Sequence, residues 1–134
     1  MAAQEGTSRT SGHPGVTGVR RGDLYDVACP TRELLDRVGS KWTVMIVLLL
    51  ADLGERRFGE LRRRMPGVSQ KMLTQTLRQL QDDGLVSRRV EPSSPPAVHY
   101  ELTRLGGTLV GPLRALKQWA EDNMTQVKAA GGSA

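Results

Sequence analysis

Six polar residues in one stretch of the chain have side chains that could read the edges of DNA bases. They recur at helical spacing: Ser69, Gln70, Lys71, Thr74, Gln75 and Arg78. Glutamine can form two hydrogen bonds with adenine, and lysine or arginine can bond guanine in the same groove. The apolar stripe of Leu73, Leu77 and Leu80 lies on the opposite side of the predicted helix. The pattern therefore predicts an amphipathic helix, capped by Ser69, that presents these donors outward.

Basic residues surround this helix and could contact DNA phosphates. Between Arg56 and Arg78 the chain has seven basic residues and one acidic residue, whereas the net charge of all 134 residues is +5. Such clustering is typical of proteins that bind polyanions. The candidates for contacts with the DNA backbone include two residues of the predicted hairpin. The full set is Arg57, Arg62, Arg63, Arg64, Arg88 and Arg89, of which Arg88 and Arg89 belong to the hairpin. Arg88 and Arg89 are neighbours in a predicted strand, so we expect only one of them to reach DNA.

The predicted elements make the donor-rich helix the second helix of a helix–turn–helix. The predicted helices are Pro30–Val38, Lys41–Asp52, Phe58–Arg64, Gln70–Asp83 and a last helix that follows Thr103 and is kinked at Pro112. The predicted strands are Leu85–Glu91 and Val98–Leu102. The proline-rich loop between the strands is uncharged over residues 93–98, and alternation predicts an exposed His99.

The order and spacing of several short motifs resemble the bacterial HxlR-type, MarR-like transcriptional regulators. The resemblance covers Cys29 to about Glu121. It is carried by Cys29-Pro30, Gly39-Ser40-Lys41-Trp42, Arg57-Phe58-Gly59-Glu60-Leu61, Pro66 to Leu73, Leu77-Arg78-Gln79-Leu80, Asp83-Gly84-Leu85-Val86, Pro95-Pro96 and Tyr100-Glu101-Leu102-Thr103. It implies a mainly α fold with a small β-hairpin, a winged helix–turn–helix with N- and C-terminal dimerisation helices. The implied function is a homodimeric regulator that binds a palindromic operator in double-stranded DNA. Related proteins often have a basic residue after the paired prolines, where this chain has Ala97.

Cys29, the only cysteine, precedes the first predicted helix. The positive end of a helix dipole can stabilise a thiolate there. Some members of the resembled family have a cysteine at this Cys-Pro position that responds to oxidants or electrophiles, which makes Cys29 a candidate redox sensor. A free cysteine also commonly fills space between helices as a small apolar residue. The sequence alone does not decide between a sensory and a structural role for Cys29.

Domain boundaries follow from composition and periodicity. We expect a disordered tail over residues 1–22, one DNA-binding and dimerisation domain over residues 23–128, and a frayed tail over residues 129–134. The residues expected at a dimer interface are Leu34, Leu109, Leu113, Leu116, Trp119 and Ala120. The longest apolar run, Val44–Ala51, is too short for a membrane helix. With the single cysteine, this predicts a cytoplasmic protein. The family resemblance further implies a bacterial protein associated with the nucleoid.

Three alternatives compete with DNA binding. An enzyme is disfavoured because the chain has two histidines, no Cys/His metal-ligand spacing and no phosphate-binding loop, so no cofactor or metal is expected. A second alternative is a regulator that binds a small-molecule effector in a pocket lined by Trp42, Trp119 and Tyr100, with a purely structural Cys29. A third is a winged-helix module that binds protein partners instead of DNA.

Overall fold

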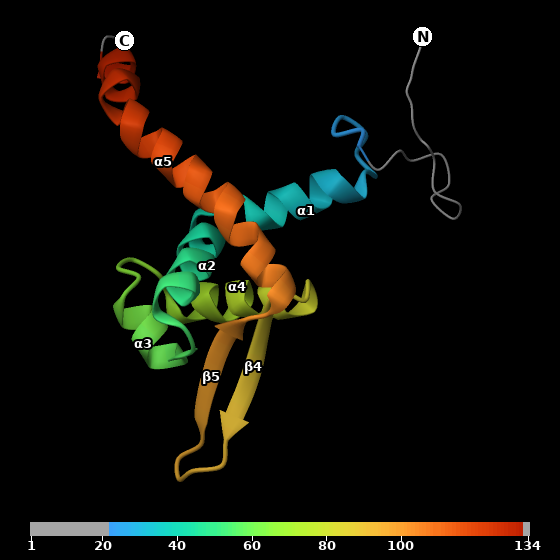
Figure 1. The fold of residues 1–134 in the computed structure, drawn as a ribbon, viewed down its shortest axis with the longest axis vertical. Coiled ribbons are helices and arrows are strands. Elements are labelled where there is room, and N and C mark those ends of the chain that lie inside the picture. Colours follow the sequence, from blue (N-terminus) through green and yellow to red (C-terminus); the bar gives the residue numbers. More distant parts are fainter. Residues whose placement is uncertain (1–21, 133–134) are drawn as a thin grey trace. The chain divides into compact units, whose positions relative to one another are not determined.

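A computed structural model describes residues 22–132 and divides the chain after Ser40 into two compact units. The N-terminal tail predicted over residues 1–22 therefore lies almost wholly outside the described residues. The elements, in chain order, are α1 (Pro30–Val38), α2 (Lys41–Leu53), β3 (Arg56–Arg57), α3 (Phe58–Arg63), α4 (Gln70–Asp82), β4 (Val86–Glu91), β5 (Ala97–Leu102) and α5 (Arg104–Gly132) (Figure 1).

The first unit contains α1. The helix begins with Pro30, whose missing N–H suits the first helical turn, and ends before Gly39. None of its residues is buried, and the side chains of Leu34 and Leu35 are 42% and 51% exposed. Leu34, which the sequence predicts at a dimer interface, is therefore exposed on this helix.

The core of the second unit is built around α2. This helix is the apolar run of the sequence, and Ile46, Val47 and Leu50 on it are buried. It packs against α4, α5 and β5. The helix predicted over Lys41–Asp52 is therefore confirmed, and it lies at the centre of the core.

The helix–turn–helix forms as predicted. A turn that contains Gly67, with φ +91°, separates α3 from α4. Leu73, Leu77 and Leu80 of α4 are buried, which leaves the polar side of the helix exposed. Glycine is favoured at the turn because other residues rarely adopt a positive φ.

The sheet has one strand more than the predicted hairpin. Its order is β3-β5-β4, and all pairs are antiparallel. The additional strand is only Arg56–Arg57, which pairs with Tyr100 and His99 of β5. Two residues show no alternation of apolar and polar side chains, so pattern analysis could not detect this strand.

The last helix, α5, is continuous through Pro112 and ends at Gly132. The frayed tail predicted over residues 129–134 is therefore wrong for residues 129–132, which are helical. Thr103 caps the helix, because its Oγ1 accepts a hydrogen bond from the Gly106 N–H at 3.0 Å. Helix α5 packs on α2, and Arg114 Nη2 lies 2.6 Å from Asp52 Oδ1 of that helix. Figure 1 shows its C-terminal part continuing beyond α2.

Together, α2–α4 and the β4–β5 hairpin make a winged helix–turn–helix, in which the hairpin is the wing (Figure 1). The fold class predicted from the sequence is thus confirmed. No helix within residues 22–132 is long and apolar enough to cross a membrane.

Candidate DNA-binding surface

The outward side of α4 carries the predicted base-reading residues. Their side chains are all exposed: Gln70, Lys71, Thr74, Gln75 and Arg78. Because the leucine stripe fixes the opposite side in the core, these residues share one solvent-facing surface. The side chains of Lys71 and Arg78 make no ion pair or hydrogen bond with any other described residue. This surface therefore offers two uncompensated cations and several neutral donors.

Ser69 sets the start of this helix. It is the N-cap residue, with extended backbone dihedrals, and its Oγ accepts a hydrogen bond from the Met72 N–H at 3.0 Å. The hydroxyl proton remains able to donate to another group. Ser69 thus combines capping with a place at the helix N-terminus, where the helix dipole favours a phosphate.

The arginines of the preceding helix differ in their partners. Arg62 and Arg63 are exposed and have no partner among the residues of the described region. In contrast, Arg64 Nε lies 3.5 Å from Glu60 Oε2, and Arg56 Nε lies 3.1 Å from the same oxygen. The single acidic residue of the basic stretch is therefore shared by two of its cations, whereas Arg62 and Arg63 have no acidic partner among the described residues.

A cleft of about 700 Å³ separates the wing from the helix–turn–helix. Gln70 and Thr74 of α4 lie on one side, and the wing tip from Ser93 to Val98 lies on the other. Arg57, at the start of α3, lines the same cleft and is exposed. The N-terminal part of α4 and the uncharged wing tip thus border one space, with an arginine beside it. Of the three aromatic residues expected to line an effector pocket, only Tyr100 lines this cleft.

The two wing arginines lie on opposite faces of the sheet, as predicted. Directly opposed residues of an antiparallel pair point to the same face. Arg88 is opposite Tyr100, which lines the cleft beside α4, whereas Arg89 is opposite His99. Arg88 is exposed and has no partner in the region that the structure covers. It is therefore the wing arginine available on the side of the sheet that faces α4.

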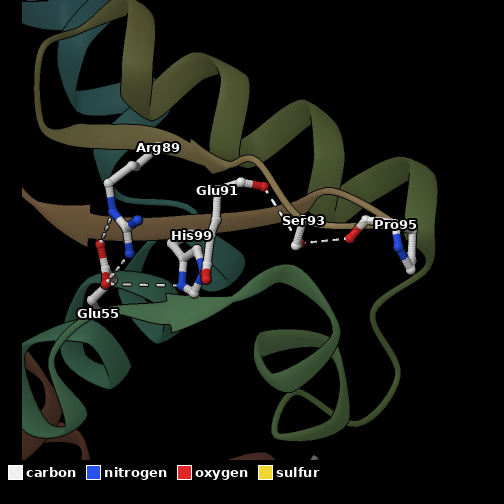
Figure 2. Close-up of polar contacts among 6 residues, drawn as sticks. All are labelled: Glu55, Arg89, Glu91, Ser93, Pro95 and His99. Atoms are coloured by element: carbon white, nitrogen blue, oxygen red, sulfur yellow. Dashed lines mark hydrogen bonds and ion pairs between the residues drawn. The ribbon is translucent and has the colours of Figure 1, made fainter.

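Arg89 is held by an acidic residue that sequence analysis did not identify. Its Nη2 donates to Glu55 Oε1 at 2.9 Å and its Nε donates to Glu55 Oε2 at 3.1 Å (Figure 2). The hydrogen bonds from Arg89 lower the pKa of Glu55 below its usual value of 4.5, and the same contacts raise the pKa of Arg89. Of the two wing arginines that the sequence offered as candidates for contacts with DNA, Arg89 is therefore the one that pairs with an acidic residue.

The prediction that His99 is exposed is wrong. Its side chain is only 13% exposed, because it lies between two carboxylates. His99 Nε2 is 2.8 Å from Glu91 Oε1, and its Nδ1 is 3.8 Å from Glu55 Oε1. Glu55 and Arg89 are 34 positions apart in the chain, so no local pattern could reveal this cluster.

The residues of α5 that were predicted for a dimer interface fall into three classes of exposure. Leu116 and Trp119 on α5 are 53% and 59% exposed. Leu109 and Ala120 are half-buried. Leu113 is only 5% exposed and belongs to the core of the single chain, so its predicted place at an interface is wrong.

The remaining candidates for site chemistry are Cys29 and groups of side chains that could hold a metal ion. Cys29 forms no disulfide and is fully buried. Among residues 22–132, no three His, Cys, Asp or Glu residues form a group that could hold a metal ion. The chemistry concentrated on the described surface is therefore hydrogen bonding and positive charge around α4.

This arrangement agrees with comparisons to known proteins. Residues 37–128 match the family model described as HxlR-like helix-turn-helix. The chain is 42% identical over 111 residues to YtfH of Escherichia coli K12, an uncharacterized HTH-type transcriptional regulator, covering 83% of this chain and 87% of that protein. It is also 42% identical over 95 residues to the uncharacterized HTH-type transcriptional regulator YybR of Bacillus subtilis, covering 71% of this chain and 75% of YybR.

Solved structures show the same similarity. The ytfH protein of Salmonella typhimurium superposes with a TM-score of 0.77 at 45% identity, over 83% of this chain and 98% of that one. The oxidized form of the redox regulator HypR superposes with a TM-score of 0.65 at 42% identity, over 71% of this chain and 97% of that one. With its exposed donors on α4 and its wing, the chain belongs to the HxlR-like helix-turn-helix family and is a DNA-binding transcriptional regulator.

Proposed function

We propose that the protein acts as a homodimer that reads a palindromic operator in double-stranded DNA with α4. The observation that supports this most directly is the exposed polar side of α4, with the unpaired cations Lys71 and Arg78. An α-helix fits the major groove, where base edges offer distinct donors and acceptors. Phosphate contacts come from Arg57, Arg62, Arg63 and Arg88, which are exposed around that helix.

Selection of bound duplexes from a random pool tests this function. A symmetric dimer would place two copies of α4 about 34 Å apart, one turn of DNA. We therefore expect the selected duplexes to contain an inverted repeat whose half-sites are centred about one turn apart. Recovery of duplexes without a common motif would contradict sequence-specific reading. A single asymmetric motif would contradict the dimer.

The proposed dimer uses the exposed apolar residues of α5. Leu116, Trp119, Met124 and Val127 are between 46% and 59% exposed on one chain, which is a high exposure for large apolar side chains. In the N-terminal unit, Leu34 is a further candidate, with 42% exposure. Association of two copies through these residues would remove them from water. We assign the protein to the bacterial cytoplasm, in contact with the nucleoid.

A response to oxidants is a second candidate function. The similarity to the redox regulator HypR, solved in oxidized and reduced forms, favours it. Burial of Cys29 opposes it, because reactive cysteines are usually partly exposed. With one cysteine in the chain, oxidation by diamide would join Cys29 to a small thiol or to Cys29 of a second copy, while diamide is reduced.

Treatment with diamide separates the two roles of Cys29. A sensor would lose or gain DNA affinity on oxidation, and Cys29→Ser would abolish the change. If Cys29→Ser responds to diamide as the unmodified protein does, the cysteine is structural. In that case any effector acts at another site, such as the cleft beside the wing.

A further inference from the structure

We propose that Glu55 is a positioning residue for DNA binding, which fixes the wing through Arg89 and thereby removes Arg89 from the cations that contact DNA. Glu55 lies between α2, which ends at Leu53, and β3, which begins at Arg56. Arg89 lies in β4, at the other edge of the sheet. Because β5 is the central strand, these two side chains meet over β5 and their two hydrogen bonds link the two edges of the sheet (Figure 2).

A chain of polar contacts continues from this pair to the wing tip. His99 of the central strand lies beside Glu55 and contacts Glu91 of β4 at 2.8 Å. The Glu91 carbonyl oxygen accepts a hydrogen bond from the Ser93 N–H at 2.8 Å. Ser93 Oγ then donates to the carbonyl oxygen of Pro95 at 2.7 Å. Figure 2 shows these residues following one another along the wing.

The wing needs such a support because its own strands provide little. Strand β4 is an edge strand that pairs only with β5, and the strand at the other edge, β3, has only two residues. A two-stranded hairpin is marginally stable in isolation. Residues 93–98 at the tip carry no charge, so ion pairs with DNA cannot fix the tip on binding. Contacts with Glu55 are therefore the main polar link between the outer face of the wing and the α2–β3 turn.

The same contacts give the two wing arginines different roles. Two of the five N–H donors of Arg89 point to Glu55, whose negative charge offsets the guanidinium. Arg88 has no partner in the described part of the chain and lies on the face toward α4. Arg88 is thus the phosphate-contacting residue of the wing, and Arg89 acts through Glu55.

Charge-changing variants of the full chain test this assignment. Glu55→Gln removes a negative charge and Arg89→Gln removes a positive charge, so a purely electrostatic effect would change DNA affinity in opposite directions. If the pair positions the wing, both variants bind more weakly, by up to about fivefold, the range expected for an exposed ion pair. The double variant Glu55→Arg with Arg89→Glu restores the pair at unchanged net charge and should recover most of the affinity.

The salt dependence of binding provides the second measurement. Binding to a mixed-sequence duplex and to a selected duplex is measured at several salt concentrations, with the thermal unfolding midpoint of each variant. Arg88→Gln, the matched control, should reduce the salt slope by about 0.9, because one phosphate contact is lost. Glu55→Gln and Arg89→Gln should leave that slope unchanged. The proposal is overturned if Glu55→Gln does not weaken binding, if Arg89→Gln reduces the slope as Arg88→Gln does, or if the exchanged pair fails to restore affinity.

Discussion

Gly106 lies directly against the main chain of Leu85, where the start of α5 meets the start of the wing. A Cβ atom at Gly106 would overlap the Leu85 carbonyl oxygen and come within 3.2 Å of Leu102 Cδ2. The carbonyl oxygen cannot easily move away, because it accepts a hydrogen bond from the Thr103 N–H at 3.0 Å. This glycine therefore allows the wing and α5 to approach closely.

Replacement of Gly106 by alanine should destabilise the protein. Forcing extra atoms into a packed site costs about 1–3 kcal/mol, and we expect a loss of this size in the free energy of unfolding by denaturant. Gly107→Ala is the matched control, because a Cβ at Gly107 meets no atom within 4 Å. That variant should gain roughly 0.5–1 kcal/mol, because alanine favours a helix over glycine. Equal stability of the two variants would contradict the close approach.

Substitutions at Ser69 separate helix capping from DNA contact. Ser69→Ala removes the hydrogen bond to Met72 and should lower stability by about 1 kcal/mol. Ser69→Asp preserves the cap but brings a negative charge to the surface that is proposed to face phosphates. We expect the aspartate variant to retain its unfolding midpoint and to bind DNA much more weakly. An aspartate variant with normal DNA affinity would show that the start of α4 is remote from phosphate.

Gln75 and Arg78 should determine sequence preference, whereas Arg63 should not. Truncation of either α4 residue to alanine should cost ~1–3 kcal/mol on the selected operator and relax preference at one base position. Arg63→Ala should weaken binding to selected and scrambled DNA equally and flatten the salt dependence. Titrations of both duplexes at several salt concentrations distinguish these effects. Equal losses on both duplexes for Gln75→Ala and Arg78→Ala would remove them from base reading.

The sequence predicted this surface because its signals are local. The leucine stripe, Ser69 and the glycine turn lie within a few residues of each other, so helical periodicity and capping rules locate α4 and its exposed side. Strand alternation likewise placed Arg88 and Arg89 on opposite faces. These features depend on residues that are close together in the sequence and not on contacts between distant parts of the chain.

The features that were missed depend on contacts between distant residues. Strand β3 exists because Arg56 and Arg57 meet Tyr100 and His99 of β5, and a two-residue strand has no period of its own. Glu55 meets Arg89 only after the sheet has formed. For the same reason, His99 was predicted to be exposed, although tertiary contacts bury most of its side chain.

The pair of Glu55 and Arg89 should make stability depend on pH at the acid end. The folded pKa of Glu55 is lower than its usual value of 4.5, so the ionised form is favoured by folding. Its contribution is therefore present above pH 4.5 and is lost as the pH falls through the lowered folded pKa. Unfolding of the unmodified protein and of Glu55→Gln should differ near neutral pH and converge in acid. A constant difference across that range would show that Glu55 ionisation does not stabilise the fold.

The oligomeric state should depend on the exposed apolar side chains of α5. Leu116→Glu places a charge at a large apolar residue that is 53% exposed, and burial of an unpaired charge at an interface is costly. Ala115→Glu introduces the same charge at the neighbouring exposed position and serves as the control. Sedimentation at micromolar concentration should show a dimer for the unmodified protein and the control, and a larger monomer fraction for Leu116→Glu. A monomeric unmodified protein would contradict the proposed homodimer, and a dimeric Leu116→Glu would exclude Leu116 from its interface.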